Sequence, residues 1–108
     1  MSLIAVDFDG TLCEHKYPDI GNPNIKLIEK LKLLIKEGHK IILWTCRDGI
    51  CLDEAVEWCK EQGIKLSAVN EDIDSVKKSL FGREKSCKIY ADIYLDDRNI
   101  SIAKFIGE

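Results

Sequence analysis

Short apolar runs alternate along the chain with longer segments in which apolar residues recur every three or four positions. The apolar runs predict strands at about residues 3–8, 40–45, 65–69 and 89–95. The segments with helical spacing predict helices at about residues 24–37, 52–62, 74–81 and 99–106. A glycine follows each of the first three of these segments, as is common at the end of a helix. Because strands and helices alternate, the pattern predicts an α/β fold with right-handed crossovers and a doubly wound parallel sheet.

Length and composition fit one compact unit. The 108 residues leave room for a single core, and 45% hydrophobic content is ordinary for a globular chain, so we expect one domain over residues 1–108. The chain has 16 Lys and Arg against 19 Asp and Glu, a net charge of −3 that argues against a dedicated nucleic-acid binder. The first apolar run, about four residues long, is too short for a signal peptide or a membrane span. We therefore expect a cytoplasmic protein without a membrane partner.

The cysteines do not form a metal-binding pattern. None of the five is part of a Cys-x-x-Cys pair, and the chain has only two histidines. This spacing argues against a zinc site and indicates reduced thiols in a reducing compartment. The five are Cys13, Cys46, Cys51, Cys59 and Cys87.

Acidic and hydroxyl side chains follow three of the four predicted strands. Asp7 and Asp9 come at the end of the first strand, Thr45 ends the second, and Asp96 follows the last. Because the carboxyl ends of parallel strands meet at the edge where open α/β sheets bind ligands, we expect these groups to gather there. Extended geometry would place Asp7 and Asp9 on one face, where two carboxylates repel. A hard divalent cation such as Mg²⁺ is the simplest way to offset that repulsion.

Three segments resemble the motifs of a known family. Asp-Phe-Asp-Gly-Thr-Leu, residues 7–12, resembles the first motif of the haloacid dehalogenase (HAD) superfamily of phosphohydrolases. Residues 41–45, a buried strand ending in threonine, resemble the second motif, and residues 93–97, a strand ending in an acidic pair, resemble the fourth. The motifs occur in the family's order and cover essentially the whole chain. Residues 41–47 and 91–99 are most similar to small, capless HAD proteins of bacteria and phages.

The resemblance implies a Rossmann-like, three-layer HAD fold with the strand order 3-2-1-4, numbered along the chain, and no cap domain. It also implies a phosphatase that hydrolyses phosphate monoesters in two steps. Asp7 would be the nucleophile that becomes an aspartyl phosphate, and Asp9 would protonate the leaving oxygen and then deprotonate the attacking water. Thr45 would hydrogen-bond the phosphoryl oxygens. Mg²⁺, the implied cofactor, would be held by a carboxylate oxygen of Asp7, the backbone carbonyl of Asp9 and a carboxylate oxygen of Asp96.

A lysine completes the set that the resemblance implies, and the chain offers more than one. Lys88 matches the small capless relatives, which carry a lysine shortly before the fourth motif. However, Lys88 precedes Asp96 by eight residues. A straight strand, rising about 3.3 Å per residue, would leave it far from the catalytic edge. Lys77 or Lys78, near the start of the upstream helix, would lie at that edge, so Lys88 is the first candidate and Lys78 the second.

Other polar residues flank the motifs and could contact the part of the substrate beyond its phosphate. Arg47 is the strongest of them because a guanidinium binds phosphate through two parallel hydrogen bonds, although it could equally pair with Asp48 or Asp72. An exposed histidine such as His15 is more often a surface residue than a catalytic one. The full set is His15, Lys16, Tyr17, Arg47 and Arg98.

Without a cap, the expected site is open. An open site accepts a phosphorylated small molecule or an exposed phosphate on a macromolecule, and a second copy of the chain in a homo-oligomer could also close it. Two other classes remain: a receiver-type signalling module and a catalytically idle HAD-like interaction protein. A receiver carries its acidic pair after the first strand and its phosphorylated aspartate after the third, whereas the third strand here ends at Val69 and Asn70.

Overall fold

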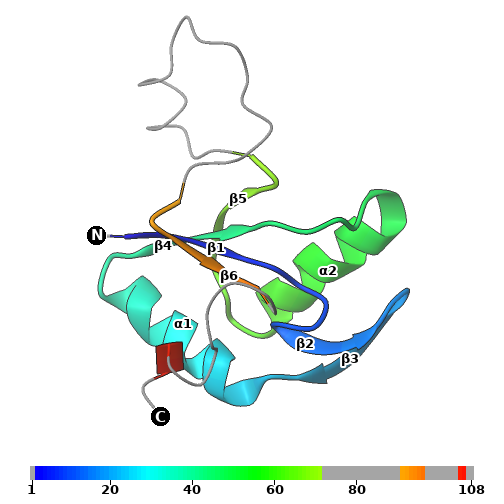
Figure 1. Ribbon diagram of the computed structural model, residues 1–108, viewed down its shortest axis with the longest axis horizontal. Helices are drawn as coiled ribbons and strands as arrows, with labels where there is room; N and C mark the ends of the chain where they lie inside the picture. The colour runs from blue at the N-terminus through cyan, green and yellow to red at the C-terminus, as the bar shows by residue number, and fades with distance from the viewer. Residues whose placement is uncertain (1, 72–90, 97–104, 107–108) are drawn as a thin grey trace, which may run out of the picture.

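Figure 1 shows a computed structural model of the protein, which describes residues 2–71, 91–96 and 105–106. Within this described part of the chain, no helix is long and apolar enough to cross a membrane. The elements are β1 Leu3–Val6, β2 Cys13–Lys16, β3 Asp19–Pro23, α1 Ile25–Lys36, β4 Lys40–Leu43, α2 Gly49–Glu61, β5 Leu66–Val69 and β6 Ile93–Leu95.

The main sheet has four strands in the order β5-β4-β1-β6, and all neighbouring pairs are parallel. The expected α/β fold with a Rossmann-like parallel sheet is therefore confirmed. β1 pairs along its whole length with β4, from Leu3 opposite Lys40 to Val6 opposite Leu43. β6 pairs with the other side of β1. The carboxyl end of β1 thus lies between the carboxyl ends of β4 and β6.

Both described helices pack against the same face of the sheet (Figure 1). Side chains alternate along β1: Ile4 and Val6 share a buried cluster with residues of α1 and α2, whereas Leu3 and Ala5 belong to a second cluster. The helix expected at 74–81 lies outside the described residues. Of the helix expected at 99–106, residues 105–106 are described; they are helical and pack against the same cluster as α1.

A β-hairpin follows β1, in the stretch between the strand and the helix that the sequence predicted. β2 and β3 pair in antiparallel fashion and form a separate two-stranded sheet. Their residues are mostly exposed and polar, so the alternation of apolar and polar positions that identifies a strand is weak here. The two strands approach closely at Gly21, where a Cβ atom would clash with the Glu14 carbonyl oxygen. Only glycine fits that position without a shift of the backbone.

Helix α1 shows how the sequence determines the buried face. Asn24 caps its first turn, with the Asn24 side chain accepting a hydrogen bond from the Leu27 N–H at 3.3 Å. Leu27, Ile28 and Leu31 recur at helical spacing and are buried against the sheet. The helix ends before Gly38, whose φ of +97° is easily adopted only by glycine.

We expect Leu31→Ala to lower the free energy of unfolding by about 2–5 kcal/mol, because it leaves a cavity under α1. Leu33 on the same helix is 51% exposed and is the matched control, since Leu33→Ala changes the helix equally but opens no cavity. Leu33→Ala should stay within about 0.5 kcal/mol of the wild type. Urea unfolding followed by circular dichroism measures both. Equal losses in the two variants would contradict the assigned helix orientation.

Candidate functional site

The turn after β1 sets the positions of both N-terminal aspartates. The Phe8 carbonyl accepts hydrogen bonds from the N–H groups of Thr11 and Leu12 at 3.2 and 3.0 Å. Gly10, with φ +82°, allows the reversal, and its N–H donates to the Cys13 carbonyl at 2.9 Å. Because β1 ends at Val6, the extended alternation expected to bring Asp9 back to the side of Asp7 does not continue that far.

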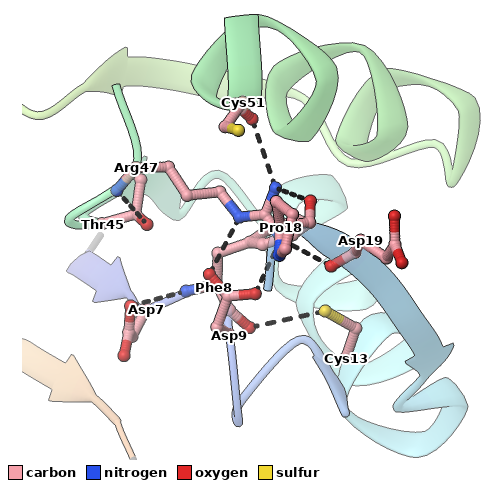
Figure 2. Close-up of polar contacts among 9 residues, drawn as sticks. All are labelled: Asp7, Phe8, Asp9, Cys13, Pro18, Asp19, Thr45, Arg47 and Cys51. Carbon is pink, nitrogen blue, oxygen red and sulfur yellow. Dashed lines mark hydrogen bonds and ion pairs between the residues drawn. The ribbon is translucent and has the colours of Figure 1, made fainter. Parts of the chain in front are cut away.

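Asp7 lies between the neighbouring strand ends. Its N–H donates to the Leu95 carbonyl of β6 at 2.9 Å, and its Oδ1 accepts from the Phe8 N–H at 2.8 Å. The first bond places Asp7 beside Asp96, the residue that follows Leu95. Figure 2 shows the Asp7 carboxylate pointing to one side of the turn and the Asp9 carboxylate pointing to the other.

A pocket of about 510 Å³ collects most of the residues that the sequence singled out. It brings together residues from the carboxyl ends of β1, β4 and β6 and from the hairpin. This is the arrangement expected for groups at the carboxyl edge of the sheet. Lys77, Lys78, Lys88, Asp97 and Arg98 lie outside the described residues. The lining residues are Asp7, Asp9, His15, Tyr17, Thr45, Cys46, Arg47 and Asp96.

The backbone of Thr45 is held by a residue that the sequence did not point to. Asn70, directly after β5, accepts a hydrogen bond from the Thr45 N–H through its Oδ1 at 2.7 Å, and its own N–H donates to the Leu43 carbonyl at 2.7 Å. Its φ of +53°, which only the structure reveals, is a conformation that asparagine tolerates better than most residues. The Thr45 Oγ1 in turn accepts the Arg47 N–H at 3.1 Å.

Arg47 forms an ion pair with Asp9, not with the Asp48 that adjoins it in sequence. Its Nε donates to Asp9 Oδ2 and its Nη2 to Asp9 Oδ1, both at 2.8 Å (Figure 2). The side chain of Arg47 is 1% exposed and that of Asp9 13%. The hydrogen bond to Asp9 raises the pKa of the Arg47 guanidinium above its usual value, while burial acts in the opposite direction.

Two rings enclose the same guanidinium. The Arg47 Cζ atom lies 4.9 Å from the centre of the Phe8 ring and 5.1 Å from the centre of the Tyr17 ring. Phe8 is buried, whereas Tyr17, on the hairpin side, is 51% exposed. These cation–π contacts add attraction and fix the plane of the guanidinium. The cation beside the Asp7–Asp9 pair is thus a side chain of the chain itself, and it neutralises Asp9.

The donor atoms near Asp7 suit a hard cation. Within the described residues, no group of three or more His, Cys, Asp and Glu side chains is placed to hold a metal ion. Mg²⁺ does not need such a group, because it is commonly bound by one or two carboxylates with water completing its shell. The carboxylates of Asp7 and Asp96 line the same pocket, and the backbone carbonyl of Asp9 is the third oxygen in the expected set.

The four cysteines in the described part of the chain are free thiols that differ in burial. Cys13 and Cys59 are buried, whereas Cys46 is exposed at the pocket and Cys51 is half-buried. Burial raises the pKa of the Cys13 thiol, and it raises the pKa of Cys59 to about 12. Cys13 and Cys59 therefore behave as small apolar side chains.

One solved structure relates this chain to another protein. It is that of a conserved protein coded by a locus from Bacteroides thetaiotaomicron, and it matches with a TM-score of 0.82 and 42% sequence identity over 97% of this chain and 86% of that chain. The two proteins belong to one family. The Bacteroides protein therefore shares the fold described above. No protein-family model and no curated protein matches the sequence.

We expect Cys46 to react with iodoacetamide in the folded protein at about pH 8, and Cys59 to react only after unfolding. The thiolate is the reacting form, and a thiol with a pKa of about 12 is almost wholly protonated at that pH. Mass spectrometry of the peptides follows each residue separately. Labelling in denaturant is the control, because all thiols should then react at similar rates. Reaction of Cys59 as fast as Cys46 in the folded protein would contradict the assignment.

Proposed function

We propose that this protein is a Mg²⁺-dependent phosphatase of the HAD type, which hydrolyses phosphate monoesters through an aspartyl phosphate on Asp7. The observation that carries the proposal is a pocket at the carboxyl edge of the sheet whose lining includes Asp7, Asp9, Thr45 and Asp96. Each comes from a segment that resembles a HAD motif. Without that common pocket, an aspartate after a strand would be an ordinary turn residue.

In the first step, a carboxylate oxygen of Asp7 attacks phosphorus, and the bond to the leaving oxygen breaks. In this step Asp9 must be protonated and released from its ion pair with Arg47, and it then gives its proton to the leaving oxygen, so the alcohol leaves neutral. In the second step, Asp9 takes a proton from water, whose oxygen attacks the same phosphorus and releases phosphate and the Asp7 carboxylate. The hydrogen bond from the Phe8 N–H to Asp7 Oδ1 supports the role of Asp7 as nucleophile, because it orients the carboxylate before the substrate binds.

Thr45 is proposed to hold the phosphoryl group. Its Oγ1 already accepts the Arg47 N–H, so its hydroxyl hydrogen can be donated to a phosphoryl oxygen. Asn70 supports this role by holding the backbone N–H of Thr45. The charge of the phosphoryl group also needs a cation, for which Lys88 and then Lys78 are the candidates, both outside the described residues.

Mg²⁺ would be held by the Asp7 and Asp96 carboxylates and the Asp9 carbonyl. When bound, it supplies positive charge that offsets the repulsion between the anionic nucleophile and the anionic phosphate.

The substrate is proposed to be a phosphorylated small molecule or a phosphate exposed on a macromolecule. Between β1 and β4, residues 7–39 form only the turn, the hairpin and α1, so this stretch contains no cap domain over the pocket. The pocket volume of about 510 Å³ is within the range of small-ligand sites. An open pocket of this kind leaves room for a leaving group that extends into solvent.

We expect the wild type to hydrolyse p-nitrophenyl phosphate with Mg²⁺ and to lose this activity in EDTA. Asp7→Asn keeps the shape of the side chain but removes the nucleophile, so its kcat should fall by about 10⁴-fold or more. Glu14 is an exposed carboxylate on the hairpin, so Glu14→Gln is the matched control and should keep the activity of the wild type. Unaltered turnover in Asp7→Asn would overturn the mechanism. A wild type that binds Mg²⁺ but hydrolyses nothing would favour the idle interaction protein.

A second expectation separates Asp9 from Asp96 in Mg²⁺ binding. Asp96→Ala removes a proposed ligand and should weaken Mg²⁺ binding by at least about tenfold. Even the loss of a residue that only hydrogen-bonds a metal ligand typically costs about that much affinity. Asp9→Asn keeps the backbone carbonyl and should bind Mg²⁺ nearly as well as the wild type. Isothermal titration calorimetry measures both, with circular dichroism to show that each variant is folded. Equal loss of affinity in the two variants would count against the proposed ligand set.

A further inference from the structure

We propose that Tyr17 forms a stacking subsite beside the phosphate site, and that the preferred substrate is a phosphate monoester whose alcohol carries a planar aromatic ring. The inference rests on the proposed function, because it names the substrate class of the same pocket. The sequence pointed to Tyr17 only as a residue that could contact the substrate, whereas the surroundings of its ring indicate what kind of group it would contact.

The hairpin brings an aromatic ring to the pocket. Tyr17 lies between β2 and β3, and it lines the pocket together with Asp7, Thr45 and Asp96. A phosphoryl group held at the carboxyl edge of the sheet would therefore have its alcohol part in the same pocket as Tyr17. Four large hydrophobic residues of the described chain are at least half exposed, and of these only Tyr17 lines this pocket.

The Tyr17 ring is the outermost layer of a stack that begins in the core. Phe8 is fully buried, and the Arg47 side chain is 1% exposed. The Arg47 Cζ atom lies 4.9 Å from the centre of the Phe8 ring and 5.1 Å from the centre of the Tyr17 ring. The guanidinium thus covers one face of the Tyr17 ring. Because Tyr17 is 51% exposed, the part of the ring turned away from the guanidinium is accessible to a planar group.

Tyr17 is held in place before any ligand binds. The guanidinium that covers its ring is itself fixed, since it donates to both Asp9 carboxylate oxygens and to the Asp19 carbonyl, each at 2.8 Å. At the other end of the side chain, a hydrogen bond with the Cys51 side chain of α2 raises the pKa of the Tyr17 hydroxyl. A ring with a fixed orientation loses little conformational freedom when a ligand binds, so more of the contact energy remains as affinity.

This geometry favours an aromatic ring over an alkyl ring of the same size. Two aromatic rings attract each other in offset-stacked or edge-to-face arrangements, in addition to the gain from burying apolar area. An alkyl ring placed against Tyr17 would gain only the burial. The additional attraction corresponds to a factor of about three to ten in affinity.

Two matched pairs of esters test the subsite. Benzyl phosphate and cyclohexylmethyl phosphate are both esters of primary alcohols and differ in whether the six-membered ring is aromatic. The wild type should hydrolyse benzyl phosphate with a kcat/KM about three- to tenfold higher. In the second pair, adenosine 5′-monophosphate and ribose 5-phosphate, the aromatic ring lies one sugar away from the phosphate. The pair with the larger preference shows how far the ring lies from the phosphate, and equal values within both pairs would overturn the proposal.

Variants of Tyr17 assign the preference to its ring. Tyr17→Phe keeps the ring and loses the hydroxyl, so the ratio of the two kcat/KM values should be retained. Tyr17→Leu keeps an apolar side chain but loses the ring, so the ratio should fall to about one. A disturbance of the fold would lower both kcat/KM values alike, and an unchanged ratio in a folded Tyr17→Leu would contradict the subsite. Tyr17→Trp enlarges the ring and should raise the ratio, which tests the same point if Tyr17→Leu does not fold.

Binding of phosphonates separates this proposal from the proposed function. Benzylphosphonate and cyclohexylmethylphosphonate cannot be hydrolysed by attack on phosphorus with loss of the alcohol. Their dissociation constants with Mg²⁺ present, measured by isothermal titration calorimetry, should differ by the same factor of about three to ten. Preferred binding of benzylphosphonate without hydrolysis of any ester would reject the phosphatase and keep the subsite. Hydrolysis without a preference would reject the subsite and keep the phosphatase, and a protein that shows neither rejects both.

Discussion

The ion pair between Arg47 and Asp9 links the parts of this small protein that surround the pocket. A buried guanidinium is costly unless every donor finds an acceptor, and removing one partner of such a pair typically costs about 3–5 kcal/mol. Here the acceptors are a carboxylate beside β1 and three backbone carbonyls from the hairpin and α2. The turn, the hairpin and the start of α2 must therefore meet at one point. Loss of the pair would disturb the relative positions of all three.

The parallel sheet provides the other half of the arrangement. The central strand β1 hydrogen-bonds to β4 on one side and β6 on the other, so Asp7, Thr45 and Asp96 reach one edge from three adjacent strands. Backbone bonds continue past the strands: the Trp44 N–H donates to the Val6 carbonyl and the Asp7 N–H to the Leu95 carbonyl, both at 2.9 Å. The groups at this edge are thus placed by backbone register, whereas the orientation of Asp9 depends on a side chain 38 residues away.

The strands and helices with a clear hydrophobic period were predicted from the sequence alone. The apolar runs located β1 and β4, and the helical spacing located α1 and α2 to within about three residues at each end. The hairpin was missed because its polar, exposed strands lack that period. The residues expected at the carboxyl edge that the structure describes do share a pocket, because the carboxyl ends of neighbouring parallel strands lie at the same edge of the sheet. The partner of Arg47 and the role of Asn70 were not predictable, because both depend on contacts between distant segments and on side-chain direction rather than on spacing.

The hydrogen bonds that Arg47 donates to the hairpin go to main-chain atoms. The carbonyls of Pro18 and Asp19 accept its hydrogen bonds, and a carbonyl oxygen is the same for every amino acid. A substitution of Asp19 can therefore leave its hydrogen bond to the guanidinium in place. Gly21 is the exception, because its close approach to Glu14 leaves no space for a side chain. The hairpin also lines the pocket through the His15 side chain, so a substitution there can alter the pocket while the main-chain contacts to Arg47 persist.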